Sequence, residues 1–338
     1  MTIARSPDIL PLAAPLHDGI GRRFEYLRLS LTEVCNFRCT YCLPDGYRKP
    51  CNRPVELSVD EIRRAVTAFA QLGLWKVRLT GGEPSLRRDF EDVARAVAAV
   101  PGIRRVAVTT NGYRLAQRAQ AWREAGISAI NVSVDSLDPA RFAAITGRDR
   151  LAEVLRGIET ARDAGFDAIK LNAVLMRGVN DDELAAMVDF VRARDLSLRF
   201  IEVMRTNDNA AFFRDRHIAG QSVIDRLEAA GWHRLPRAPG AGPAVELGHP
   251  DAKGRIGIIA PYAKDFCNSC NRLRLSSDGR LHLCLFGDGG SDLRPLLSTD
   301  DPQPLIAHIR GLVATKAPAH RLHDGNSGAT PHLASIGG

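Results

Sequence analysis

Short runs of apolar residues recur through the first two thirds of the chain, and stretches of helical periodicity separate them. Runs of this length that are rich in Val, Ile and Leu are typical of strands in a buried sheet. The sequence therefore predicts six strands, at Tyr26 to Leu31, Lys76 to Thr80, Val106 to Thr110, Ile130 to Val134, Ile169 to Val174 and Leu198 to Val203.

A helix is predicted between the first two strands. Ser58 and Glu61 form a capping-box pattern, apolar residues then follow at helical spacing, and Gly73 ends the run. Strands that alternate with helices favour a parallel sheet with crossover helices. Six such units predict an α/β fold with a partial (β/α)6 barrel of the TIM type, and an open doubly wound sheet remains the alternative.

Glycines and polar residues gather where the predicted strands end. They occupy Gly81 to Pro84, Thr109 to Gly112 and Ser133 to Ser136, and Met204 and Arg205 follow the last strand. In parallel α/β folds the chemistry lies at the carboxyl ends of the strands. This placement favours the barrel and predicts a functional site at that end of it.

The chain is predicted to divide into three parts. Pro, Gly and Ala become frequent from Pro236 to Pro250, which indicates a boundary or an exposed hairpin loop. We therefore expect an N-terminal arm over residues 1–24, the barrel over residues 25–235 and a smaller C-terminal domain over residues 236–338.

Cys35, Cys39 and Cys42, here named the first cysteine set, follow the first predicted strand at close spacing. Such thiols can hold three corners of an iron–sulfur cube and leave the fourth iron open to a small molecule. A disulfide framework is disfavoured because the chain is long and its 7 cysteines are odd in number. Structural zinc needs a fourth ligand, and Cys51, interpreted as a small apolar or surface thiol, has no partner at matching spacing.

Cys267, Cys270 and Cys284 form the second cysteine set, in which a CxxC pair is followed by a distant third thiol. Two sulfurs at that spacing can bind one ion or one cluster. A zinc ion with His282 as its fourth ligand is the alternative that the spacing leaves open.

The net charge is +7, and several of the cations lie on different predicted strands. Lys76 and Arg78 lie two residues apart on one predicted strand, so they point to the same side of it. Arg272 and Arg274 do the same if their segment is extended. A barrel would gather such cations in one cavity. Charge-assisted hydrogen bonds from them suit a triphosphate.

Composition argues against two classes of partner. Aromatic residues make up only 6% of the chain and no basic run is interleaved with them, so a single-stranded nucleic acid is not expected to bind. No apolar run approaches the roughly 18 residues that span a bilayer, and Met1 to Arg23 shows no continuous hydrophobic segment. We therefore expect a cytoplasmic protein, where clustered thiols stay reduced, without a membrane partner.

The motif CxxxCxYC after a strand resembles the signature of radical S-adenosylmethionine (SAM) enzymes. The CxxCNRxR frame of the second cysteine set, the Gly-Gly-Glu-Pro segment and the Gly-Gly end narrow the resemblance to the GTP 3',8-cyclase family of molybdenum cofactor biosynthesis, over Tyr26 to the last residue. The resemblance implies a [4Fe–4S] cluster with SAM on its open iron at the first cysteine set. It also implies a second [4Fe–4S] cluster at the second set, whose open iron meets the substrate base.

The resemblance implies a lyase that converts GTP to (8S)-3',8-cyclo-7,8-dihydroguanosine 5'-triphosphate by hydrogen abstraction from ribose C3'. SAM contacts would then fall on Tyr41, Gly82, Glu83, Ser133 and Met204. GTP contacts would fall on Arg28, Lys76, Arg78, Thr109, Lys170, Arg272 and Arg274. The catalytic group would comprise Arg272, Arg274 and a C-terminal finger that enters the site, Gly337 and Gly338.

The partners that the resemblance implies are GTP, a reducing electron donor and the cyclic pyranopterin monophosphate synthase that receives the product, with the chain as a monomer or homodimer. Two other functions remain possible. A radical SAM peptide-modifying enzyme with an auxiliary cluster would turn over without GTP. An iron–sulfur or zinc nucleic-acid-binding module would show steep salt dependence.

Overall fold

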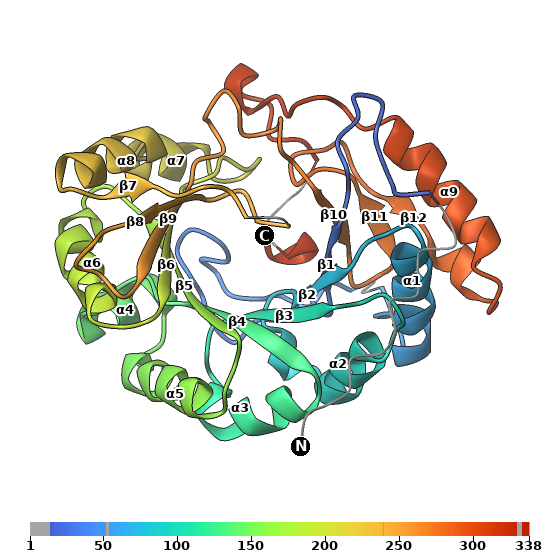
Figure 1. Ribbon diagram of the computed structural model, residues 1–338, viewed down its shortest axis with the longest axis horizontal. Coiled ribbons are helices and arrows are strands. Elements are labelled where there is room, and N and C mark those ends of the chain that lie inside the picture. Colours follow the sequence, from blue (N-terminus) through green and yellow to red (C-terminus); the bar gives the residue numbers. More distant parts are fainter. Residues whose placement is uncertain (1–13, 52–53, 239, 330–332, 338) are drawn as a thin grey trace.

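The computed structural model, drawn in Figure 1, describes residues 14–51, 54–238, 240–329 and 333–337. Its strands form one sheet in the order β12-β11-β10-β1-β2-β3-β4-β5-β6-β9-β8-β7. The sheet curves around a central space and the helices lie on its outer side. The strands are β1 Tyr26–Ser30, β2 Lys76–Thr80, β3 Arg105–Thr110, β4 Ile127–Ser133, β5 Ala168–Leu175, β6 Ser197–Glu202, β7 His233–Arg234, β8 Val245–Gly248, β9 Arg255–Ile259, β10 Arg272–Leu275, β11 Arg280–His282 and β12 Ser291–Asp292.

The six predicted strands are confirmed as β1 to β6, and consecutive members of this group pair in parallel. Two strands that the alternation did not predict extend the parallel sheet, because β10 pairs with β1 and β9 pairs with β6. No helix separates β9 from β10 along the chain. The βα alternation that identified the other strands is therefore absent from that segment.

The helices lie on the outer face of the sheet, and all of them except α7 have buried residues. In α1 the predicted capping box is present, since Ser58 accepts from the Glu61 amide and Glu61 accepts from the Ser58 amide. Gly73 follows α1 with φ +88°, a left-handed conformation that favours glycine. The helices are α1 Val59–Gln71, α2 Phe90–Ala98, α3 Leu115–Glu124, α4 Pro139–Thr146, α5 Leu151–Asp163, α6 Leu184–Arg192, α7 Ala210–Arg216, α8 Gly220–Ala229 and α9 Gln303–Ala314.

The C-terminal third extends the partial barrel at both edges. β7 and β8 pair antiparallel, so the Pro- and Gly-rich stretch between them is a hairpin loop, one of the two predicted possibilities. β7 to β9 extend the edge at β6, whereas β10 to β12 extend the edge at β1. The predicted fold class, an α/β partial barrel with further C-terminal structure, is confirmed. Within the described ranges, no helix is long and apolar enough to cross a membrane.

Candidate functional site

A cavity of about 1780 Å³ occupies the centre of the barrel. Single ligand pockets usually measure about 300–1,000 Å³, so this cavity has room for more than one small molecule. Glu83 and Gly337 are not among its lining residues, and Gly338 lies outside the described residues. The other predicted site residues all line it, namely Arg28, Cys35, Cys39, Tyr41, Cys42, Lys76, Arg78, Gly82, Thr109, Ser133, Lys170, Met204, Cys267, Cys270, Arg272, Arg274 and Cys284.

The first cysteine set lies in the loop after β1, and its three thiols are half-buried. The Cys42 amide donates to the Cys39 carbonyl over 2.9 Å, which closes a turn between two of the thiols. Burial raises the pKa of Cys35 to about 11 and that of Cys42 to about 12. Thiolates in this loop therefore need a bound positive centre, as an iron–sulfur cluster would provide.

The Gly-Gly-Glu-Pro segment packs against the start of the cysteine loop. A Cβ added at Gly81 would lie 2.3 Å from the Thr32 carbonyl oxygen, and one at Gly82 would lie 2.4 Å from the Val34 carbonyl oxygen. Only glycine fits at these two positions. The segment is further held by the Glu83 amide, which donates to the Val34 carbonyl over 2.8 Å.

The Glu83 side chain is fully buried and accepts hydrogen bonds from its own chain. Its carboxylate accepts from the Ser85 amide and hydroxyl, the Thr110 hydroxyl and the Asn111 amide, at 2.6–3.1 Å. Asn111 in turn donates to the Asn36 side chain over 2.8 Å. Glu83 thereby connects the loops after β2 and β3 to the cysteine loop.

Tyr41 lies between two thiols of the first set and donates to Asp135 Oδ2 over 2.9 Å. Asp135 is 1% exposed, and its other oxygen accepts from the Val174 amide over 2.8 Å. Burial raises the pKa of Asp135 to about 6. This carboxylate lines the cavity beside the first set, and the sequence analysis did not single it out.

The second cysteine set enters the cavity from the loops that flank β10 and β11, and its thiols are also half-buried. The Cys270 amide donates to the Cys267 carbonyl over 3.1 Å, which closes the CxxC turn. Burial acts to raise the pKa of Cys270, but the positive charges of Arg272 and Lys316 outweigh burial and lower it. Cations thus surround this set.

The zinc alternative at the second cysteine set depends on His282 as the fourth ligand. Among the residues that the structure describes, no three Cys, His, Asp or Glu side chains lie close enough to share one metal ion. His282 lies against Gly290 and is not among the cavity-lining residues. Cys51 is exposed and outside the cavity. The three-thiol donor sets suit clusters, whose corners are separate irons.

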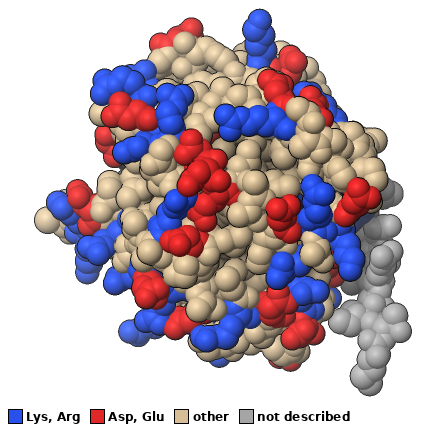
Figure 2. Space-filling model, turned by 90° about the vertical axis from the view of Figure 1, so that its left-hand side faces the viewer, with Lys and Arg blue, Asp and Glu red and all other residues tan. Residues whose placement is uncertain are grey.

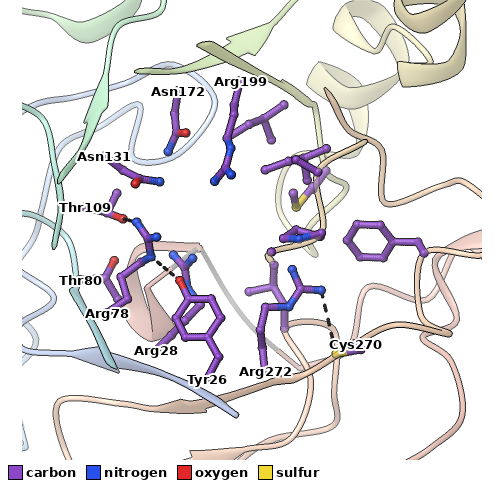
Figure 3. A pocket seen from close by; sticks show the side chains of 18 of the residues that line it. Tyr26, Arg28, Arg78, Thr80, Thr109, Asn131, Asn172, Arg199, Cys270 and Arg272 are labelled. Atoms are coloured by element: carbon purple, nitrogen blue, oxygen red, sulfur yellow. Dashed lines mark hydrogen bonds between the residues drawn. The ribbon is translucent and has the colours of Figure 1, made fainter. Parts of the chain in front are cut away.

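Strand register brings the predicted cations together in two rows across β10, β1 and β2. Arg274, Arg28 and Arg78 are neighbours in one row, whereas Tyr26 lies between Arg272 and Lys76 in the other. The Arg78 guanidinium donates to the Tyr26 hydroxyl and, over 3.1 Å, to the Thr109 hydroxyl (Figure 3). Burial acts to raise the pKa of Tyr26, but the surrounding cations Arg78, Arg28 and Lys76 lower it to about 7.

The opposite wall carries side chains that the sequence analysis missed. Asn131, Asn172 and Arg199 point into the same space as the cation rows in Figure 3. Arg199 donates to Glu246 over 2.6 Å, and burial together with Arg199 lowers the pKa of the neighbouring Lys170 to about 8. The signal was present, because Asn131 and Asn172 stand two residues from Ser133 and Lys170 and so share their strand faces.

The last described residues, around η5 Leu333–Ile336, lie inside the ring of strands next to β1 (Figure 1). The Ala334 amide donates to the Cys42 thiol. The Gly337 carbonyl accepts from Arg28 over 2.9 Å and from Arg274 over 2.6 Å. The C-terminal segment, which was predicted to enter the site, contacts two of the predicted cations through the Gly337 carbonyl.

Met204 and Ser133 complete the predicted SAM group. Ser133 ends β4 and pairs with Asn172 of β5. Met204 packs in an apolar cluster with Leu285 and Phe286, close to the second cysteine set. On the face shown in Figure 2, Lys and Arg are interspersed with Asp and Glu, in contrast to the cation rows inside the cavity.

Comparison with known proteins agrees with this geometry. The radical SAM superfamily model matches residues 29–191, and the molybdenum cofactor synthesis C model matches residues 196–322. The structure of Streptococcus suis SuiB bound to S-adenosylmethionine is similar in fold, with a TM-score of 0.60, 14% identity, and coverage of 85% of this chain and 68% of that chain.

Relatives named GTP 3',8-cyclase match nearly the whole chain. The Stenotrophomonas maltophilia protein (strain K279a) is 59% identical over 324 residues, which cover 96% of this chain and 99% of the relative. The Aeromonas hydrophila protein is 56% identical over 330 residues, which cover 96% of each chain. The chain therefore belongs to the GTP 3',8-cyclase family, within the radical SAM superfamily.

Proposed function

We propose that this chain is a radical SAM GTP 3',8-cyclase, which converts GTP to (8S)-3',8-cyclo-7,8-dihydroguanosine 5'-triphosphate in the first step of molybdenum cofactor biosynthesis. One observation carries the proposal: both cysteine sets line a single cavity, and the cation rows line it too. Such a site can hold two small molecules and two clusters at once.

The charges in the cavity support this pair of ligands. SAM carries a sulfonium and an ammonium group, and the buried carboxylate of Asp135 stands beside the first cysteine set. A triphosphate is a polyanion, and Arg28, Lys76 and Arg78 lie side by side on β1 and β2. Each charge-assisted hydrogen bond from these cations would contribute about 1.5–3 kcal/mol to binding.

Bound SAM and its cluster would supply the radical that accepts a hydrogen atom from ribose C3'. The residues of the chain position the substrates for it. Arg28, Lys76, Arg78, Thr109 and Lys170 would hold GTP at one side. Arg272 and Arg274 would hold it beside the second cysteine set, where Arg272 lies 4.0 Å from the Cys270 sulfur.

The SAM side of the proposal uses Tyr41, Gly82, Ser133 and Met204. Glu83 is fully buried and does not line the cavity, so a direct contact with the SAM ammonium would require its side chain to become exposed to the cavity. The proposal also includes [4Fe–4S] clusters at both cysteine sets and a reducing electron donor. The product would pass to cyclic pyranopterin monophosphate synthase, and the enzyme would act as a monomer or homodimer.

The test is anaerobic reconstitution followed by iron and sulfide counts and by reaction with dithionite, SAM and GTP, with each substrate omitted in turn. We expect about eight irons per chain and formation of 5'-deoxyadenosine that depends on GTP. Cys51→Ala is the matched control, because this exposed thiol lies outside the cavity and its loss should leave the iron count unchanged. SAM cleavage that is independent of GTP would contradict the proposal that GTP is the substrate.

A further inference from the structure

The N-terminal arm contains a buried ion pair that the cation rows do not include. Arg22 is 8% exposed and Asp18 is 7% exposed. Arg22 Nε donates to Asp18 Oδ2 over 2.6 Å, and the Arg22 amide donates to Asp18 Oδ1 over 2.9 Å. The Asp18 carboxylate therefore fixes both the backbone and the guanidinium of Arg22.

The Arg22 guanidinium reaches the loop of the second cysteine set. Nη1 donates to the Cys267 carbonyl over 3.0 Å and to the Pro318 carbonyl over 2.6 Å, and Nη2 donates to the Ala317 carbonyl over 2.8 Å. The Cys267 carbonyl is the one that also accepts from the Cys270 amide and closes the CxxC turn. Arg22 thus holds the peptide group on which the conformation of this turn depends.

A second buried cation supports the other half of the same set. Lys316 is 7% exposed, and its ammonium donates to the carbonyl of Leu283, the residue before Cys284. The ammonium also lies 5.8 Å from the ring centre of Phe24, two residues after Arg22. The arm and the segment after α9 therefore lie side by side, and together they contact both parts of the second cysteine set.

We infer that Arg22 is a positioning residue for the second cysteine set, which presents Cys267 and Cys270 to a bound cluster and offsets its negative charge. The inference rests on the proposed function, namely on a cluster at this set. Replacing a residue that orients a metal ligand by hydrogen bonding commonly changes the metal affinity about 10–100-fold. Arginine suits this position because its planar fork serves several acceptors at once, which a lysine ammonium cannot reproduce.

The test measures each cysteine set by itself. One background replaces the three cysteines of the first set by alanine, and the other replaces those of the second set. Each background is prepared with Arg22, with R22K and with R87K, reconstituted anaerobically, and assayed for iron content, iron release to a chelator and the EPR spectrum after reduction. R22K keeps a positive charge beside Asp18, so it avoids an unpaired buried carboxylate.

R87K is the matched control. Arg87 has a buried side chain, pairs with the partly exposed Asp89 over 2.6 Å and donates to the carbonyls of Leu31 and Leu57. It thus resembles Arg22 in its ion pair and its carbonyl acceptors, and it contacts neither cysteine set in the described residues. We expect R22K to lose second-set iron to the chelator about 10–100-fold faster and to keep first-set iron. R87K should leave the iron content and the rate of iron release of both sets unchanged.

Equal second-set iron and equal release rates with Arg22 and R22K would overturn the inference. Loss of first-set iron to the same extent would also overturn it, because that result reports general destabilisation. A second set that holds no cluster even with Arg22, rather than about four irons, would overturn the proposed second cluster and the inference with it. That failure is visible before R22K is compared, so the two are distinguishable.

Discussion

The two cysteine sets have the same three-thiol composition and opposite surroundings. Around the first set, burial raises the pKa of the thiols and the carboxylates of Glu83 and Asp135 raise it further. At the second set the cations Arg272 and Lys316 lower the pKa of Cys270 in spite of burial. One cavity thus has an acidic end and a basic end.

The difference shows how one chain can give two similar donor sets different tasks. Carboxylates favour a cationic ligand such as SAM at the first set, whereas arginines favour an anionic nucleotide at the second. The potential of an iron–sulfur cluster also depends on nearby charge and hydrogen bonds. The identity of the three ligands alone would distinguish neither the ligand nor the chemistry of the two ends.

Removing one thiol from each end tests whether the two ends have separate tasks. We expect Cys39→Ala to abolish formation of 5'-deoxyadenosine down to the uncatalysed background, because the proposed cluster at the first set would supply the electron to SAM. Cys270→Ala should retain SAM cleavage and lose the cyclised product. Both products are measured by chromatography after anaerobic turnover. Loss of SAM cleavage to background in both variants would mean that the two ends do not have separate tasks.

The C-terminal segment joins the two ends, and Gly337→Ala tests that connection. A Cβ at Gly337 would lie 2.1 Å from Thr80 Cγ2, and the residue has φ +66°. The segment must therefore shift, and Arg28 and Arg274 lose their shared acceptor. We expect cyclisation to fall on the order of 100-fold, since displacement of a positioning group has effects of that size.

Gly311→Ala in α9 is the control for the tail variant, because a Cβ there meets nothing within 4 Å. Iron content should be the same in both variants and in the parent chain. Full cyclase activity in the Gly337 variant would show that the contacts of the segment with Arg28 and Arg274 have no part in the reaction.

The alternation of apolar runs with helices predicted strands β1 to β6, whereas β9 and β10 lack that alternation and were not predicted. The SAM and GTP contacts came from the family resemblance. Arg272 and Arg274 were predicted to share one face if their segment is extended, and β10 shows that it is extended. Arg22 could not be found in this way. Its partners Cys267 and Pro318 are distant in the chain, and no periodicity connects a turn in the arm to them.

The orientation of side chains in loops was also not predictable from the sequence. Glu83 follows two glycines at the end of β2, and that placement cannot tell whether the carboxylate faces a ligand or its own chain. In the structure it accepts hydrogen bonds from Ser85, Thr110 and Asn111. Asp135 is a similar case, because its burial beside the first cysteine set depends on how the loop after β4 folds over Tyr41.

Two lysines of the cavity, Lys76 and Lys170, should make GTP binding dependent on pH. Burial lowers the pKa of both Lys76 and Lys170 to about 8, below the usual value for an ammonium. Both groups are charged at pH 7, and they lose protons as the pH rises through 8. Because the triphosphate favours the ammonium forms, we expect affinity to fall about tenfold per pH unit for each group that deprotonates.

Calorimetric titration of GTP without SAM between pH 7 and 9.5 measures this dependence. Lys170→Met should bind GTP more weakly at pH 7 and show a shallower pH slope, because one lysine fewer then loses its proton. An affinity that is constant across the range would contradict the placement of the triphosphate against these two lysines.

The acidic end should affect stability, and Tyr41→Phe tests it in the iron-free protein. Burial raises the pKa of Asp135 to about 6, above that of the unfolded chain, so its contribution to stability is fully present below about pH 4 and is lost as the pH rises through 6. The Tyr41 hydroxyl limits that loss by donating to the carboxylate. Without it the pKa of Asp135 rises further, and we expect the free energy of unfolding to drop by about 1–2 kcal/mol at pH 8 and by less at pH 5.

Urea unfolding at both pH values measures the difference, with Tyr113→Phe as the control for the same chemical change away from Asp135. An equal drop at the two pH values would show that the ionised carboxylate does not depend on Tyr41.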